Sequence, residues 1–99
     1  MKYIHFEWDD NKEQENIKKH GITFNEAKSC FFDPNARLIF DNDHSINEER
    51  FIIVGISQTL KLLVVCHCYK SEDEIIRIIS ARKANKIEVK QYGDIKNEK

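Results

Sequence analysis

The chain has 99 residues, of which 40% are hydrophobic and 33% are charged, and its formal net charge is −1 at pH 7. A chain of this length forms one domain, which we expect to span residues 1–99, and its apolar fraction is sufficient for a packed core. The near-zero charge excludes a globally basic nucleic-acid-binding protein, and no segment approaches the about 20 apolar residues of a membrane span.

The N-terminal third predicts a short strand followed by two helices, over residues 3–6, 10–19 and 23–32. Asp9 or Asp10 caps the first helix, and a glycine follows its C-terminal end. The second helix starts at the capping box Thr23-Phe24-Asn25-Glu26 and stops before Asp33-Pro34, because the residue before a proline avoids helical dihedral angles.

The pattern then changes to that of β-strands, which we expect at residues 37–41, 51–57, 60–69 and 74–82. Residues 42–45 predict a turn, and Gln58-Thr59 predicts a short hairpin connection. A second capping box, Asn85-Lys86-Ile87-Glu88, opens a short helix that extends to about Tyr92. Runs of helices followed by runs of strands favour an α+β fold, in which the helices pack on one face of a central antiparallel sheet.

The last predicted strand carries Arg77 inside an apolar run and ends at Arg82. An unpaired charge in the middle of a sheet is costly. Arg77 therefore either pairs with a carboxylate, for which Glu49 and Glu74 are available, or lies on an open face that receives an anion. Strand parity places the two arginines on opposite faces unless a bulge intervenes. For Arg82 the simpler interpretation is a surface charge at a strand end.

Histidine and tyrosine positions supply the other chemistry. His67 lies in an apolar strand and is the acid–base group best suited to neutral pH, with a buried, hydrogen-bonded histidine as the alternative. His20 ends a helix, where a cation favours the helix dipole, and His44 lies in a predicted turn. Glu88 is first a capping residue, and Tyr92 lies four residues later on the same helix face, where it packs on the sheet or stacks a base.

The patterns for metals and disulfides are weak. Asp41, Asp43 and His44 superficially resemble metal ligands, but no further residue completes a recognisable site, so we expect no metal and no other cofactor. The three cysteines form neither an even framework nor a C-x-x-C pair. Cys66 and Cys68 share one strand face and serve as small apolar residues, which favours a cytoplasmic protein. The N-terminus lacks the pattern of a signal peptide.

A set of residues spaced along the chain from Phe6 to Tyr92 forms a recognisable pattern. The set comprises Phe6-Glu7-Trp8-Asp9, Asn16, Lys19-His20-Gly21, Phe24, Glu26-Ala27, Asp33-Pro34, His44-Ser45, Glu49-Arg50-Phe51, Gly55, His67, Arg77-Ile78-Ile79-Ser80-Ala81-Arg82, Ala84, Glu88 and Tyr92. It resembles the BrnT family, the toxins of BrnT–BrnA type II toxin–antitoxin systems. Cys68 and Lys70 depart from it, since threonine and arginine are usual there, and lysine lacks the planar fork of arginine.

The resemblance implies a RelE-like fold and a ribonuclease that inhibits translation and growth by cleaving RNA. It also implies a BrnA-like antitoxin that neutralises the toxin and through which alone operator DNA is contacted, with no role for a membrane. Cleavage by the RNA 2′-hydroxyl needs a base, an acid and a cation near the phosphate. Because the sequence lacks a convincing carboxylate–histidine metal cluster, we expect a metal-independent reaction.

The resemblance and the residue chemistry together assign site residues. We place Arg82 at the scissile phosphate and His67 in proton transfer. The expected catalytic residues are Arg77, Arg82, His67, Glu49 and Tyr92. The expected RNA-binding residues are Lys83, Lys86, Lys19, His20 and His44. The alternative function is a noncatalytic module that binds RNA or an acidic protein partner through the same basic residues. A neighbouring gene for a ribbon-helix-helix protein would favour the toxin.

Overall fold

The computed structural model describes residues 4–44 and 48–96, except the side chains of His44, Ile95 and Lys96. Its strands are β1 His5–Glu7, β2 Arg37–Phe40, β3 Phe51–Ile56, β4 Leu62–Lys70 and β5 Ile75–Lys83. Its helices are α1 Asp10–His20, α2 Phe24–Ser29 and α3 Lys86–Lys96, with 3₁₀ turns η1 Cys30–Phe32 and η2 Asn42–His44. The elements form the predicted α+β architecture. No helix in the described ranges is long and apolar enough to cross a membrane.

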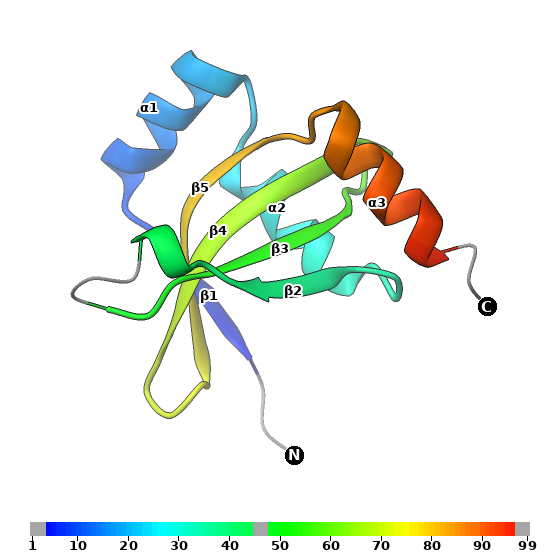
Figure 1. The fold of residues 1–99 in the computed structure, drawn as a ribbon. Coiled ribbons are helices and arrows are strands. Elements are labelled where there is room, and N and C mark those ends of the chain that lie inside the picture. The colour runs from blue at the N-terminus through cyan, green and yellow to red at the C-terminus, as the bar shows by residue number, and fades with distance from the viewer. Residues whose placement is uncertain (1–3, 45–47, 97–99) are drawn as a thin grey trace.

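The five strands form one sheet in the order β1-β5-β4-β3-β2. One side, which we call the helix face, packs against α1 and α2 around a core that includes Phe24, Leu63 and Ile78. We call the opposite side the open face. The last helix, α3, crosses one end of the open face, where Tyr92 packs with Val54 and Val64 (Figure 1).

Local capping explains where the helices begin and end. The Asp9 carboxylate accepts a hydrogen bond from the Asn11 backbone N–H at 2.8 Å, and Gly21 ends α1 with a φ of 71°. In the second helix Thr23 Oγ1 accepts from the Glu26 N–H at 3.1 Å. The Glu26 carboxylate does not complete that capping box, because it accepts from hydroxyl groups of the β3–β4 loop instead.

The α3 capping box is complete. Asn85 Oδ1 accepts from the Glu88 N–H, and the Glu88 carboxylate accepts from the Asn85 N–H, each at 2.8 Å. Both orphan donors at the start of the helix are therefore satisfied. The helix extends to Lys96, beyond the predicted end near Tyr92.

A β-bulge in β5 sets the faces of the two arginines. On β4, Cys66 is paired with Ser80 and His67 with Ile78, so Ile79 is an extra residue. An extra residue reverses the alternation of side chains along the strand. Arg77, paired with Cys68, and Arg82, paired with Val64, therefore share the open face.

The first strand, β1, is an edge strand beside β5, a position in the sheet that the sequence patterns did not predict. It runs parallel to β5, with His5 opposite Ile75 and Glu7 opposite Arg77. Beyond this short pairing, the buried side chain of Asn16 forms hydrogen bonds at the edge of β5 in place of a strand partner. Its Oδ1 accepts from the Ala81 N–H at 3.0 Å, and its Nδ2 donates to the carbonyl of the α1–α2 loop at 2.9 Å.

The second helix and the β3–β4 connection differ from their predicted boundaries. The helix expected over residues 23–32 ends at Ser29 and continues as the 3₁₀ turn η1. The hairpin connection is longer than Gln58-Thr59, because Ser57 closes a loop by donating to the Lys61 carbonyl at 2.8 Å, and Leu60 has a φ of 64°. The predicted residues Tyr3 and Ser45 lie outside the described ranges.

His67 is a core residue of the helix face, with no exposed surface. Its ring lies 4.8 Å from the Phe31 ring. Nδ1 lies 3.1 Å from the Val65 carbonyl oxygen and must donate to it, so the neutral ring accepts at Nε2 from the Tyr69 hydroxyl, also at 3.1 Å. Burial lowers the pKa of His67 to about 4. The alternative of a satisfied, buried histidine therefore describes His67.

The close approach of β3 to η1 generates a stability prediction. A Cβ at Gly55 would lie 2.9 Å from the Cys30 carbonyl oxygen and 3.2 Å from the Ala36 Cβ. We expect Gly55→Ala to lower the free energy of unfolding by about 1–3 kcal/mol, since buried backbone must move. The control Gly93→Ala lies in α3 with nothing within 4 Å, and should raise stability by up to about 1 kcal/mol. Urea denaturation of both variants tests this, and equal effects would contradict it.

The burial of His67 generates a pH prediction. Its folded pKa of about 4 lies below the ordinary 6.5, so the unfolded chain binds a proton between these values that the folded chain does not. The contribution of the neutral ring to stability is complete above pH 6.5 and is lost as the pH falls toward 4, by about 2 kcal/mol at pH 5. The advantage of the wild type over His67→Gln should shrink by that amount from pH 7.5 to pH 5. His5→Gln, at an exposed histidine, is the control, and a constant His67→Gln difference would refute the assignment.

Candidate functional site

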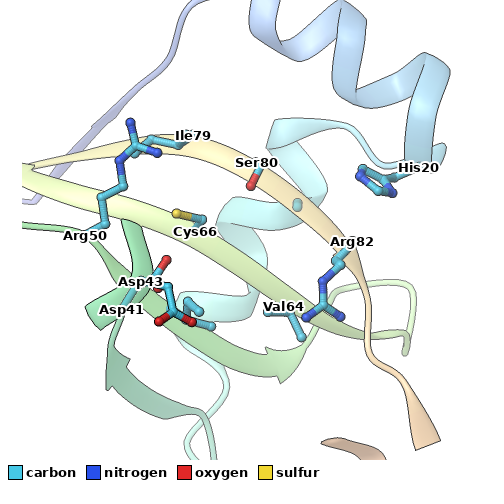
Figure 2. Close-up of a pocket in the computed structure, with 11 residues that line it drawn as sticks. His20, Asp41, Asp43, Arg50, Val64, Cys66, Ile79, Ser80 and Arg82 are labelled. Carbon is cyan, nitrogen blue, oxygen red and sulfur yellow. The ribbon is translucent and has the colours of Figure 1, made fainter. Parts of the chain in front are cut away.

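A cavity of about 300 Å³ lies on the open face, between β3, β4 and β5. Arg50 and Arg82 stand at its two ends, with Cys66 and Ser80 between them (Figure 2). His20 approaches from the end of α1. A thiol and a hydroxyl form the floor, two guanidinium cations flank it, and the carboxylates of Asp41 and Asp43 line the cavity as well. The guanidinium groups at the two ends can bind an anion with several oxygen atoms.

A carboxylate from α3 holds Arg82 in place. The two terminal nitrogens of Arg82 donate to the two oxygens of Glu88 at 2.8 and 2.9 Å. These hydrogen bonds raise the pKa of Arg82 and lower that of Glu88. The Arg82 side chain remains 42% exposed, so the pair orients the guanidinium more than it stabilises the fold. The remaining N–H groups of Arg82 can donate to a ligand.

Arg77 also has a carboxylate partner, but not one of those expected. Its Nη1 donates to the Glu7 carboxylate of β1 at 2.7 Å, rather than to Glu49 or Glu74. Both side chains are more than a third exposed. Arg77 therefore combines the two alternatives from the sequence, since it has a partner and also lies on an open face.

Arg50 is a site residue that the sequence patterns did not indicate. It precedes β3 and shares the open-face cavity with Ile52, two positions further along the chain. Its Nε lies 3.9 Å from the Glu48 carboxylate, which Lys70 approaches to 3.6 Å from β4. The alternation of side chains in the predicted strand could have placed Arg50 on this face. Lys70 lies on the open face as well.

Of the five expected catalytic residues, only Arg82 lines this cavity. His67 belongs to the helix face, so the sheet separates it from both Arg77 and Arg82. Tyr92 is buried under α3, and its hydroxyl donates to Asp33 at 2.6 Å. Burial and this hydrogen bond raise the pKa of Tyr92 to about 12. His67 and Tyr92 are both buried and hydrogen-bonded within the fold, away from the open-face cavity.

Glu49 lies on a different cavity, and the expected RNA-binding residues are dispersed. Glu49 shares that cavity with Tyr69 and Asp73, away from Arg82. Among the expected RNA-binding residues whose side chains the structure describes, only His20 lines the open-face cavity. Three lysines are exposed elsewhere: Lys19 on α1, Lys83 on the helix-face side of β5 and Lys86 at the start of α3. The side chain of His44 lies outside the described part.

The thiol on the cavity floor is not an activated nucleophile. Burial raises the pKa of Cys66 above its ordinary value, so the thiol stays protonated at neutral pH. The three cysteines, Cys30, Cys66 and Cys68, are all free. Asp41 and Asp43 line the same cavity, but within the described ranges they do not join a group of three residues able to hold a metal ion.

Comparisons with known proteins place this geometry in a family. Residues 8–88 match the family model described as the ribonuclease toxin BrnT of type II toxin–antitoxin systems. The 1.1 Å crystal structure of the ribonuclease toxin BrnT from Brucella abortus is similar, with a TM-score of 0.60 and 26% sequence identity. That match covers 87% of this chain and 99% of the Brucella chain. A search of curated proteins found no significant match. The chain belongs to the BrnT family of ribonuclease toxins of type II toxin–antitoxin systems.

Proposed function

We propose that this toxin cleaves RNA without a metal ion, with the open face as its RNA-binding surface and Arg82 at the scissile phosphate. The observation that supports this most directly is that Arg50, Arg77 and Arg82 share the open face, where the bulge at Ile79 brings the two arginines of β5 to the same side. Guanidinium groups on one rigid sheet can follow the phosphates of a single RNA strand. Arg77 and Arg82 both belong to β5, so the two guanidinium groups follow one another along this strand.

The chemistry of RNA cleavage explains why arginine suits this position. Attack of the 2′-hydroxyl on the adjacent phosphate adds negative charge to the phosphate oxygens in the transition state. A preorganised guanidinium stabilises that charge, which a metal ion does in other nucleases. Glu88 fixes the plane of the Arg82 fork before RNA arrives, so little reorganisation is needed. We leave His67 out of proton transfer, because the sheet lies between its ring and Arg82.

We further propose that a BrnA-like antitoxin neutralises the toxin and supplies the DNA recognition of the pair. The net charge of −1 makes this chain a poor ligand for operator DNA by itself. RNA as the substrate places the toxin in the cytoplasm, where three free thiols are also expected to persist. A noncatalytic RNA-binding module would bind RNA through the same arginines but leave it intact.

The arginine assignment predicts a separation of activity from stability. Arg82→Ala should reduce RNA cleavage by about 10²–10³-fold and abolish growth arrest, because a transition-state cation is lost. Its melting temperature should stay close to that of the wild type, since the Arg82–Glu88 pair is half-exposed. Arg77→Lys should also lower toxicity, because lysine lacks the planar fork.

Two controls sharpen this experiment. Lys90→Ala removes an exposed cation of α3 and should keep full toxicity. His67→Gln should lower the melting temperature more than the cleavage rate of the folded protein. Full toxicity of both Arg77→Lys and Arg82→Ala at normal expression would show that the proposed site is wrong. The family assignment would still hold.

Metal independence has its own test. Purified toxin, freed from its antitoxin, should cleave RNA in excess EDTA at the same rate as in magnesium, because guanidinium groups supply the positive charge. The measurement is the rate of product formation on a labelled RNA. Loss of cleavage in EDTA that magnesium restores would show a metal-dependent enzyme. Tight binding of RNA without cleavage under either condition would favour the noncatalytic module.

A further inference from the structure

A second cavity, of about 530 Å³, lies at the end of β3 beside the β4–β5 hairpin. The first residue of β3, Phe51, is paired with His67, so the part of β4 beyond His67 has no β3 partner. The cavity occupies the space next to this unpaired stretch. Neither Arg50 nor Arg82 is among the described residues that line it.

The floor of this cavity is apolar and aromatic. Phe51 lies 5.2 Å from Tyr69 and 5.4 Å from Phe40, measured between ring centroids. Leu38 completes the floor from β2 and is 52% exposed, and Phe40 is 40% exposed. Contiguous exposed apolar groups of this kind mark a surface that a partner covers.

The rim of the cavity is acidic. The carboxylates of Glu48, Glu49 and Asp73 line it. Glu48 is paired with Arg50 and Lys70, so Glu49 and Asp73 give the rim its excess negative charge. Burial raises the pKa of Tyr69, and the negative charge of Asp73 raises it further. RNA phosphates are repelled by such a rim. A side chain with a cationic head and an apolar stem can pair with the carboxylates of the rim and pack on the aromatic floor.

We infer that this cavity receives an arginine or lysine side chain of the antitoxin, and that apolar residues of the same segment cover Leu38 and Phe40. The inference rests on the proposed function, in which an antitoxin neutralises the chain. Cys68 lines the cavity and is the strand partner of Arg77. The aromatic floor lies on the helix face, since Phe51 is the strand partner of His67, and Cys68 reaches the cavity from the open-face side of β4. An antitoxin segment seated here therefore covers the edge of β4, next to the strand pair of Cys68 and Arg77.

The test measures the Kd of the purified cognate antitoxin for full-length toxin variants by calorimetry. Asp73→Asn removes a rim charge, and asparagine tolerates the φ of 70° at this position. We expect it to weaken binding about tenfold, and Leu38→Ala to do the same, as central interface contacts do. The matched controls are Glu72→Gln, in the same turn with a φ of 56°, and Ile39→Ala, on the opposite face of β2. Both controls should bind within about twofold of the wild type.

Three outcomes would overturn this inference. Equal Kd values for the cavity variants and their controls would place the antitoxin elsewhere. Loss of RNA cleavage by Asp73→Asn with unchanged antitoxin binding would make the cavity an RNA site. Dissociation of a toxin dimer by Leu38→Ala, measured by sedimentation, with unchanged antitoxin binding would make a second copy the occupant. Calorimetry measures binding and does not depend on catalysis. The antitoxin site can therefore be wrong while the ribonuclease activity is right, and the ribonuclease activity can be wrong while the antitoxin site is right.

Discussion

The extra residue in β5, Ile79, is the constraint on which the arrangement of the open face depends. Without it, Arg77 and Arg82 would lie on opposite faces of the sheet. Asn16 holds the strand directly after the bulge, because β1 is paired with β5 only as far as Arg77 and the Ala81 N–H needs another acceptor. The amide of Asn16 is buried, so its loss would leave unsatisfied polar groups on both of its partners.

Carboxylates orient the arginines without hiding them from solvent. Glu7 comes from β1 and Glu88 from α3, so each arginine is held by an element outside its own strand. Half-exposed ion pairs contribute little to stability, and a phosphate can share or replace the carboxylate at small cost. A fully desolvated pair would be far harder to open. The exposure of these pairs therefore fits a surface that binds and releases RNA.

The sequence was sufficient for features with local causes. The strands near residues 51–57 and 74–82 follow from β-branched, apolar runs, and the cap at Asp9 from one side chain and the N–H groups next to it. The parallel pairing of β1 with β5 joins residues about 70 positions apart, as does the Arg77–Glu7 pair, so no local pattern reports either. The sequence predicts the bulge only as a condition for both arginines to share a face, since Ile79 continues the apolar run of Ile78 and no local residue marks the extra position.

The site residues show the same division. Arg77 and Arg82 were found because an arginine in an apolar strand is unusual in itself. The burial of His67 could not be predicted, because it depends on η1 folding back to place Phe31 on the ring. The sequence pattern is the same for a buried histidine and a catalytic one, and only the helix covering that face distinguishes them.

The Tyr92 position illustrates how a residue can serve the site from a distance. Asp33 accepts hydrogen bonds from the Tyr92 hydroxyl at 2.6 Å and from the Ile56 N–H of β3 at 2.8 Å. It thereby ties α3 to the sheet. Glu88 lies one turn earlier on α3, so the anchor at Tyr92 fixes the carboxylate that orients Arg82. The pKa of about 12 keeps the phenol protonated at neutral pH, and a protonated phenol is what this hydrogen bond requires.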